Sequence, residues 1–305
     1  MARKNNITEP KPLKTVKVAC AQLAIDIDNP ADNLRLAVSA IEAALEQGAK
    51  IIVLPELASS GYMFNSMDEA KELAEPLDGR TIKGWTKALQ GTDAIVIGGL
   101  NESHKDGHLY NSVVLVSENG AEHTYRKIHL WGSEQLFFTP GNKPPTVIET
   151  VHGKVAVGIC YDAYFPELSR AVALAGAQLL VLPTNAPRNI PGEPSPPASF
   201  GTTPMQLNIW AGMAHVNGMF VAGCDRCGPE RGVEWIGVSA IFDESGLPLA
   251  THPADFGPAL LLADCVLEKA DNKVRGPKNH LLNDRRPEVY PTTGTGAKIK
   301  KISII

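Results

Sequence analysis

The stretch from Lys154 to Gly176 limits what this chain can fold into more than any other part of the sequence. It opens with an apolar, β-branched run that predicts a strand over 154–159, and a polar, aromatic turn follows at Cys160. A helical pattern then begins at Glu167 and ends at Gly176. A cysteine at such a strand-to-helix elbow has its sulfur lifted out of the sheet, and neighbouring N–H groups point toward the same spot. Cys160 therefore stands where an enzyme would place a nucleophile, although a lone cysteine is more often a buried structural residue.

Strand and helix patterns alternate along the rest of the chain, with hairpins between them. Strands are predicted over 15–21, 50–55, 94–100, 109–116, 122–125, 146–149, 178–182, 219–224, 238–242 and 259–265, and helices over 29–47, 68–73, 81–90 and 205–216. An aromatic-rich stretch over 131–145 and a proline-rich stretch over 187–204 are predicted to be loops. This order favours an α/β fold with a mixed sheet and helices outside it.

The composition is that of an ordinary globular protein, with 44% hydrophobic and 20% charged residues and a formal net charge of −4. We therefore expect no nucleic-acid partner. We also expect no membrane association, because no apolar run approaches the roughly 20 residues of a membrane span. We expect a flexible lead-in over 1–14, a single domain over 15–290 and a tail over 291–305.

The cysteine pattern predicts a reducing compartment. Five cysteines are an odd number without the spacing of a disulfide framework, which favours a cytoplasmic protein with free thiols. Cys224 and Cys227 have the spacing of a metal or redox pair. A second such pair is absent, so the pair is weak evidence for a metal site.

Three polar residues follow apolar strands: Glu56, Lys127 and Cys160. Catalytic groups of open α/β sheets gather at the carboxyl ends of strands. A desolvated carboxylate can take the proton of a thiol, while a lysine and the N–H of Tyr161 can stabilise an oxyanion, which together make a set for acyl transfer. The residues alone leave other interpretations open: Glu56 as a solvated loop acid, Lys127 as a surface lysine, or His129 as the partner of the thiol.

The motifs around these residues resemble the nitrilase superfamily of carbon–nitrogen hydrolases. The matching motifs are Leu-Pro-Glu over 54–56, Arg-Lys-Ile-His-Leu over 126–130 and Gly-Ile-Cys-Tyr-Asp over 158–162, and they occur in the order of that family. Further matches are Phe-Thr-Pro-Gly over 138–141 and Arg-Pro-Glu over 286–288, and the resemblance extends from about residue 16 to residue 290.

The resemblance implies a four-layer α-β-β-α sandwich with two mixed sheets, and a catalytic triad of Glu56, Lys127 and Cys160. It implies no metal and no cofactor, and a homodimer or higher homo-oligomer that associates through a helical interface. Glu134 matches a second glutamate of the amidase members, where it positions the substrate amide or assists the base.

The residues after Cys160 separate the branches of the family. True nitrilases have Cys-Trp-Glu there, and carboxylate-binding relatives have arginines where this chain has Ala163 and Tyr164. We therefore predict a small-molecule amide substrate, neutral and with an apolar acyl group, because a carboxylate would enter without a cation. Candidates to line its pocket are Tyr62, Phe138, Tyr164 and Asn185. The alternatives are an N-carbamoyl hydrolase or a nitrilase with the same triad and, from a different class, a non-catalytic binding protein of the same fold.

Overall fold

The structure is a computed structural model that describes residues 13–189, 199–200, 203–252 and 256–290. The chain divides into two compact units, Met1–Asn272 and Lys273–Ile305. Within the second unit, the hairpin of β18 (Val274–Gly276) and β19 (Asn279–His280) is followed by a 3-10 turn, η3 (Pro287–Val289). The predicted tail over 291–305, and all but the last two residues of the predicted lead-in over 1–14, lie outside the described residues.

The first large sheet of the first unit has the strand order β17-β1-β2-β3-β4-β5. Its central strands β1, β2 and β3 run parallel, whereas β17, β4 and β5 pair antiparallel with their neighbours. The bounds are β1 (Val16–Gln22), β2 (Ile51–Val53), β3 (Ile95–Ser103), β4 (Leu109–Ser117), β5 (Gly120–Arg126) and β17 (Ala259–Cys265). The sheet is therefore mixed, as predicted.

The second large sheet has the order β16-β15-β12-β8-β7-β6. Its centre is again parallel, with β7, β8 and β12 side by side, and antiparallel strands form both edges. The bounds are β6 (Val147–Thr150), β7 (Gly153–Val157), β8 (Leu179–Thr184), β12 (Phe220–Asp225), β15 (Ala240–Phe242) and β16 (Pro248–Thr251).

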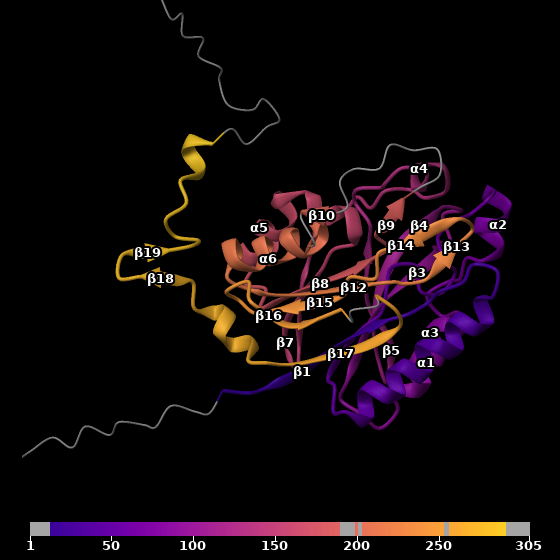
Figure 1. The fold of residues 1–305 in the computed structure, drawn as a ribbon, viewed down its shortest axis with the longest axis horizontal. Helices are drawn as coiled ribbons and strands as arrows, with labels where there is room; N and C mark the ends of the chain where they lie inside the picture. The colour runs from indigo at the N-terminus through magenta and orange to yellow at the C-terminus, as the bar shows by residue number, and fades with distance from the viewer. Residues whose placement is uncertain (1–12, 190–198, 201–202, 253–255, 291–305) are drawn as a thin grey trace, which may run out of the picture. The chain divides into compact units, whose positions relative to one another are not determined.

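Helices cover the outer faces of both sheets (Figure 1). The helices α1 (Pro30–Glu46) and α3 (Arg80–Ala88) lie on the side of the first sheet, and α5 (Pro166–Leu174) and α6 (Met205–Asn217) on the side of the second. Alternate residues of β1 belong to different cores: Val18 and Cys20 pack in the cluster that contains the second sheet, while Ala19 and Ala21 pack with residues of α1 and α3. Burial on both faces of this sheet confirms the predicted four-layer α-β-β-α sandwich.

Short elements account for most differences from the sequence prediction. The strand predicted over 50–55 is shorter, because β2 ends at Val53 and the chain turns immediately afterwards. The loop predicted over 131–145 contains the short helix α4 (Glu134–Phe137). A small sheet of β13 (Pro229–Glu230), β14 (Val233–Trp235) and β9 (Pro187–Asn189) was not predicted, because strands of two or three residues show no period.

The remaining elements are short as well. They are α2 (Met67–Glu72), the 3-10 helices η1 (Cys160–Tyr164) and η2 (Leu267–Asp271), and the two-residue strands β10 (Ser199–Phe200) and β11 (Thr203–Pro204). The latter two fall within the proline-rich stretch, most of which lies outside the described residues. Among the described residues, no helix combines the length and apolar character needed to cross a membrane.

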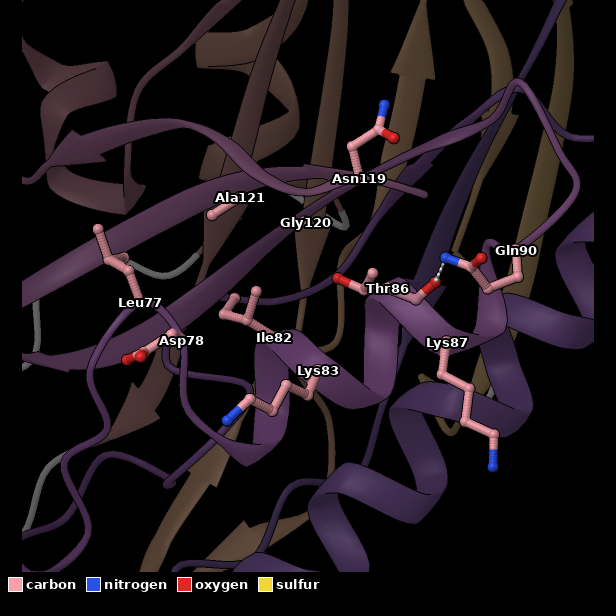
Figure 2. Close-up of a pocket in the computed structure, with 10 residues that line it drawn as sticks. All are labelled: Leu77, Asp78, Ile82, Lys83, Thr86, Lys87, Gln90, Asn119, Gly120 and Ala121. Atoms are coloured by element: carbon pink, nitrogen blue, oxygen red, sulfur yellow. Dashed lines mark hydrogen bonds between the residues drawn. The ribbon is translucent and has the colours of Figure 1, made fainter.

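A surface pocket lies between α3 and the turn that joins β4 to β5 (Figure 2). Ile82, Lys83 and Lys87 of α3 line one side, and Asn119 and Gly120 line the other. The side chain of Gln90 joins the two sides, because its Nε2 donates to the carbonyl of Glu118 at 2.6 Å. None of the predicted site residues lines this pocket.

Candidate active site

Three of the predicted site residues follow the carboxyl ends of parallel strands. Glu56 comes just after β2, Cys160 after β7 and Asn185 after β8. Lys127 is the residue directly after β5, an antiparallel edge strand, and its N–H donates to the carbonyl of Asn111 on β4. The strand ends thus present a carboxyl group and an amine from the first sheet and a thiol from the second.

The turn at Glu56 depends on a close approach between two backbones. Leu57 has a positive φ of 47°, which is rare for a residue with a branched side chain. Gly99 of β3 lies directly beneath this turn, and a Cβ there would meet the N of Leu57 at 2.1 Å. Glycine at position 99 therefore gives the turn the space that presents Glu56 to the site.

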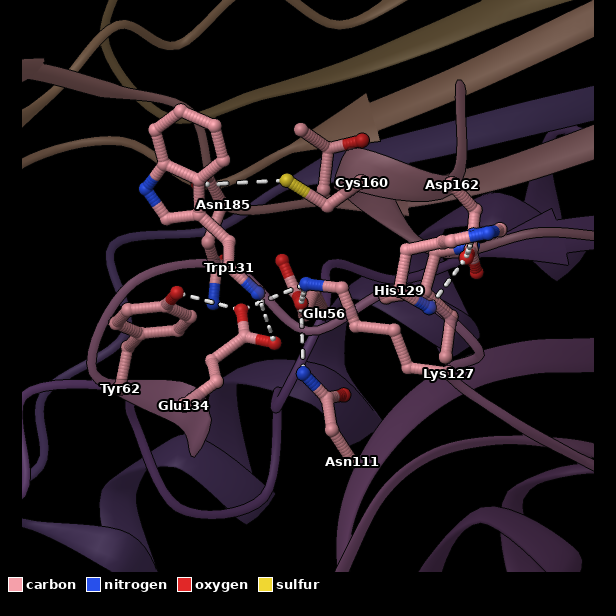
Figure 3. Close-up of polar contacts among 12 residues, drawn as sticks. Glu56, Tyr62, Asn111, Lys127, His129, Trp131, Glu134, Cys160, Asp162 and Asn185 are labelled. Atoms are coloured by element: carbon pink, nitrogen blue, oxygen red, sulfur yellow. Dashed lines mark hydrogen bonds and ion pairs between the residues drawn. The ribbon is translucent and has the colours of Figure 1, made fainter. Parts of the chain in front are cut away.

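Two carboxylates form ion pairs with the ammonium of Lys127 (Figure 3). Its Nζ lies 2.7 Å from Oε1 of Glu56 and 2.6 Å from Oε1 of Glu134. The side chains of Lys127 and Glu56 are fully buried, and that of Glu134 nearly so. Nδ2 of Asn111 donates to Oε1 of Glu56 at 2.7 Å. Oε2 of Glu56 is buried and has no hydrogen-bond partner among the described residues.

Glu134 is held from three directions. It begins the short helix α4. Its Oε1 accepts the hydroxyl hydrogen of Tyr62 at 2.5 Å, in addition to its contact with Lys127. Its Oε2 accepts the backbone N–H of Trp131 at 3.2 Å. The structure thus joins the second predicted glutamate to Glu56 through one shared ammonium.

The pKa values of Glu56 and Lys127 in this cluster differ from those of the free side chains. Burial raises the pKa of Glu56 to about 7; Lys127 opposes this shift and Glu134 adds to it. Burial by itself would lower the pKa of Lys127, but the carboxylates of Glu134 and Glu56 outweigh it and raise the pKa above its usual range. Lys127 therefore remains an ammonium, while Glu56 exchanges protons near neutral pH.

Cys160 sits on a strained elbow. Its φ is 45°, and it is the first residue of η1. Its Sγ lies 3.7 Å from the carbonyl oxygen of Asn185. Burial raises the pKa of the thiol well above its usual range, the charge of Glu56 raises it further, and Lys127 opposes both. The resting side chain is thus a thiol that needs a base before it can attack.

Tyr161 directly follows the nucleophile candidate. Its backbone N–H belongs to the first turn of η1, where the N–H groups have no acceptor within the helix. Its ring packs edge-on against Trp131, with centroids 4.7 Å apart, and near Tyr164 at 5.4 Å.

His129 is engaged away from the thiol. Its Nδ1 lies 2.8 Å from Oδ1 of Asp162, and its ring stacks on Phe165 with centroids 3.5 Å apart. The interpretation of His129 as a partner of Cys160, which the residues alone left open, has no contact to support it among the described residues.

The four predicted pocket residues have different surroundings. Tyr62 reaches the cluster through Glu134, and Asn185 contacts Cys160 through its carbonyl. Phe138 is buried in an apolar cluster that also contains Tyr62, and it packs edge-on against Phe64. Tyr164 is 49% exposed.

Several contributors to the site were missed at the sequence level. Asn111 is a buried polar residue in a largely apolar strand, a signal that a polar partner lies opposite. Arg226 and Glu230 form a fully buried ion pair at 2.9 Å, and Oε2 of Glu230 accepts the backbone N–H groups of Tyr62 and Met63 at 2.9 Å each. This pair fixes the segment that carries the Tyr62 hydroxyl, and no local pattern marks it.

Among the described residues, no group of three His, Cys, Asp or Glu side chains is placed to hold a metal ion. Cys224 of the CxxC pair is buried, and its Sγ lies 3.3 Å from the carbonyl oxygens of both Ala21 and Val53. Cys224 therefore forms part of the packing between the two sheets.

Comparison with known proteins agrees with this arrangement. The family described as carbon-nitrogen hydrolase matches residues 17–272. The chain is 34% identical to a nitrilase of Pyrococcus abyssi over 284 residues, which cover 90% of this chain and 99% of the relative. It is 29% identical to an N-carbamoylputrescine amidase of Solanum lycopersicum over 305 residues, covering 95% and 96% of the two chains.

A solved structure of similar fold is a mutant of the amidase from Nesterenkonia sp. AN1, with a TM-score of 0.72 and 26% identity over 92% of this chain and 96% of that one. That structure is described as showing covalent addition of the acetamide moiety of fluoroacetamide at the active site cysteine. The present chain belongs to the carbon–nitrogen hydrolases of the nitrilase superfamily, on its amidase-like branch. It is thus an enzyme that hydrolyses carbon–nitrogen bonds, in amides or nitriles.

Proposed function

We propose that this enzyme hydrolyses a carboxamide to a carboxylate and ammonia through a thioester on Cys160. The observation that carries the proposal is the buried ion pair of Glu56 and Lys127, whose charges act on the pKa of a thiol at a strained elbow. Burying two charges is costly, and a non-catalytic binding protein would have no need of a buried acid beside a thiol. The arrangement favours the enzyme over that alternative.

In the first half of the reaction, Glu56 acts as the base. Its pKa of about 7 suits it to accept the thiol proton near neutral pH. Its Oε2, which has no partner among the described residues, is the oxygen free to receive that proton. Sγ of Cys160 then forms a bond to the amide carbon, and the carbonyl oxygen becomes an oxyanion.

The oxyanion needs positive charge and an N–H donor in place before it forms. The ammonium of Lys127 keeps its proton because Glu134 and Glu56 raise its pKa, so it offers a permanent charge. The backbone N–H of Tyr161 is the second donor in this proposal. Such preorganised donors usually make the largest single contribution to acyl-transfer catalysis.

The second half returns the enzyme to its starting state. Protonated Glu56 gives its proton to the departing nitrogen, the C–N bond breaks, and ammonia leaves behind a thioester. Glu56 then removes a proton from water, which attacks the thioester carbon. The C–S bond breaks to release the carboxylic acid, and the proton on Glu56 passes to the sulfur and restores the thiol. Glu134 holds Lys127 in place throughout and lies where a substrate amide nitrogen can be oriented.

We expect the acyl pocket to accept neutral, apolar groups. Tyr62, Phe138 and Tyr164 offer aromatic surface. Asn185 offers a side-chain amide that is buried and has no partner among the described residues for either polar atom. Arg226, a cation of the type that binds a substrate carboxylate, is already paired with Glu230.

The second candidate is an N-carbamoyl hydrolase or a nitrilase with the same triad, which the names of the two relatives above favour. A screen of ammonia release from purified enzyme, over amides, nitriles and N-carbamoyl amino acids, separates these possibilities. We expect the highest kcat/KM with neutral amides. Preferential turnover of nitriles or N-carbamoyl substrates would replace the proposal with this second candidate.

We further propose that the enzyme is a homodimer or a higher homo-oligomer. The outer helices of the second sheet carry the half-exposed apolar residues Leu174 on α5 and Val216 on α6, a surface suited to association. Light scattering coupled to size-exclusion chromatography tests this, and a monomeric mass at micromolar concentration would exclude it.

A further inference from the structure

Asp162 is a fully buried carboxylate with four hydrogen bonds (Figure 3). Its Oδ2 accepts the hydroxyl hydrogen of Tyr125 at 2.7 Å and the backbone N–H of Ile159 at 3.0 Å. Its Oδ1 accepts the backbone N–H of His129 at 3.0 Å and contacts Nδ1 of that residue at 2.8 Å. Because a carboxylate only accepts, Nδ1 of His129 carries the hydrogen. Each oxygen thus binds two donors.

These donors come from the two segments that carry the reacting groups. Ile159 directly precedes Cys160, and Tyr125 and His129 lie two residues before and two residues after Lys127. One side chain therefore binds the backbone in front of the thiol and both flanks of the lysine. No covalent connection other than the long path through 128–159 joins these two segments.

The segment before the thiol needs such support. Cys160 has a φ of 45°, a conformation that is strained for a residue other than glycine and persists only where its surroundings hold it. Asp162 closes the turn around Cys160 in both directions. Its own N–H donates to the carbonyl of Ile159 at 2.9 Å, while its carboxylate accepts the N–H of Ile159.

The segment around the lysine is held by groups with fixed orientation. Burial, and then the charge of Asp162, raise the pKa of Tyr125 above its usual range, so the phenol stays protonated and donates. The ring of His129 is clamped by its stack on Phe165, with an interplanar angle of 9°. Asp162 therefore meets donors that are already aligned.

We propose that Asp162 is a positioning residue that sets the Cys160 thiol relative to the Lys127 ammonium. This inference rests on the proposed function of those two residues. Asp162 acts through the backbone of their segments and does not touch the substrate. It explains why the residue two positions after the nucleophile is a buried acid.

The test compares Asp162→Asn with the wild-type enzyme. The variant keeps the size of the side chain, but its NH₂ group faces two of the four donors. We expect kcat to fall by about 100-fold, the usual effect of misplacing reacting groups by about 1 Å, with KM changed less than about threefold. We also expect the pH midpoint of alkylation by iodoacetamide to rise, because Lys127 lowers the pKa of Cys160 and would no longer be held beside it.

Two further variants serve as controls. Tyr125→Phe removes one donor and leaves the carboxylate, so we expect a smaller fall in kcat in the same direction. Glu75→Gln alters another buried carboxylate, which accepts the N–H and the hydroxyl hydrogen of Thr81 outside the site. We expect this variant to lower the melting temperature without moving the alkylation midpoint.

The proposal is overturned if Asp162→Asn loses stability as Glu75→Gln does but keeps the wild-type kcat and alkylation midpoint. Should Asp162→Asn fail to fold, Tyr125→Phe decides: a reduced kcat with a raised midpoint supports the proposal, and wild-type values refute it. Failure of the proposed function looks different, since Cys160→Ala would then retain turnover. The alkylation midpoint still tests the role of Asp162 in that event, because it requires no substrate.

Discussion

Nζ of Lys127 and Oε1 of Glu134 form a buried ion pair of 2.6 Å between residues seven positions apart in the chain. The short helix α4 begins at Glu134 and turns its carboxylate back toward the end of β5. The pair leaves the ammonium little freedom, since Glu56 holds it at 2.7 Å from a second direction. A charge held in this way costs little reorganisation when an oxyanion forms beside it.

Replacing the nucleophile tests the mechanism most directly. We expect Cys160→Ala to reduce kcat by at least about 10⁴-fold, and Cys160→Ser to be nearly as poor because a hydroxyl is far less acidic than a thiol. The melting temperature should change little, since Cys160 is only partly buried whereas the other four cysteines are buried. For the same reason, iodoacetamide should label Cys160 before Cys20, as mass spectrometry of peptides would reveal. Turnover at the wild-type rate in Cys160→Ala would disprove the mechanism.

The pH profile tests the role of Glu56. Burial raises its pKa to about 7, and a base works only when ionised, so kcat/KM should rise as the pH increases through about 7. The measured midpoint reflects the cluster as a whole, because the charges of Lys127 and Glu134 act on the pKa of Glu56. Initial rates from pH 5 to 9 provide the measurement. Glu56→Gln should lose the activity, and with it the rise in kcat/KM through about pH 7. A rise in kcat/KM centred near pH 4.5 would mean that Glu56 ionises as an ordinary carboxyl group and would contradict the proposal.

Tyr62→Phe isolates one hydrogen bond to the cluster. The hydroxyl of Tyr62 donates to Glu134 at 2.5 Å, while its ring packs edge-on against Trp235 and should stay in place. A hydrogen bond to a charged group contributes about 1.5–3 kcal/mol, so we expect kcat/KM to fall at least about tenfold. Tyr110→Phe is the matched control, because that hydroxyl donates to Asp106 outside the cluster. Equal losses in the two variants would argue against a specific role for Tyr62.

Gly99→Ala tests how the fold presents Glu56. The added Cβ would meet backbone atoms of Glu56 and Leu57 at 2.6 and 2.1 Å, and backbone cannot move aside as a flexible side chain does. We expect a loss of unfolding free energy of about 1–3 kcal/mol or more, together with a loss of activity. Gly212→Ala on α6 is the control, since nothing lies within 4 Å of its Cβ position, and it should be neutral or stabilising. Urea unfolding of both variants measures the difference, and equal stabilities would refute the argument.

A matched pair of substrates tests the preference for neutral amides. A neutral amide and its analogue with a terminal carboxylate differ only in charge, and Arg226 is already paired with Glu230. We expect kcat/KM to be at least about tenfold higher for the neutral substrate, which corresponds to about 1.4 kcal/mol. A preference for the carboxylate would require another cation at the site. Arg188, which is half-exposed and 4.0 Å from Glu234, would be the first residue to mutate in a search for that cation.

The sequence by itself predicted an α/β fold with a mixed sheet, and it named Glu56, Lys127 and Cys160 as the candidate reacting groups. Periodicity marked the long strands, and the predicted strands over 50–55 and 154–159 placed Glu56 and Cys160 at their ends; in the structure β2 and β7 end two residues earlier, at Val53 and Val157. These are local signals: a strand buried on both faces must be apolar throughout, so a polar residue at its end stands out. Lys127 follows β5, a largely polar edge strand, so the order of the motifs was the stronger reason to name it.

Only the tertiary structure decided how these groups are held. Glu56 and Lys127 meet across 71 positions of sequence, Tyr62 and Glu134 across 72, and Tyr62 and Glu230 across 168. Asp162 binds donors on His129 and Tyr125, which lie 33 and 37 positions away. Because His129 contacts Asp162, it is not the partner of the thiol. A hydrogen bond between distant segments leaves no period in either one, because its geometry arises only when the two sheets pack and bring their strand ends together.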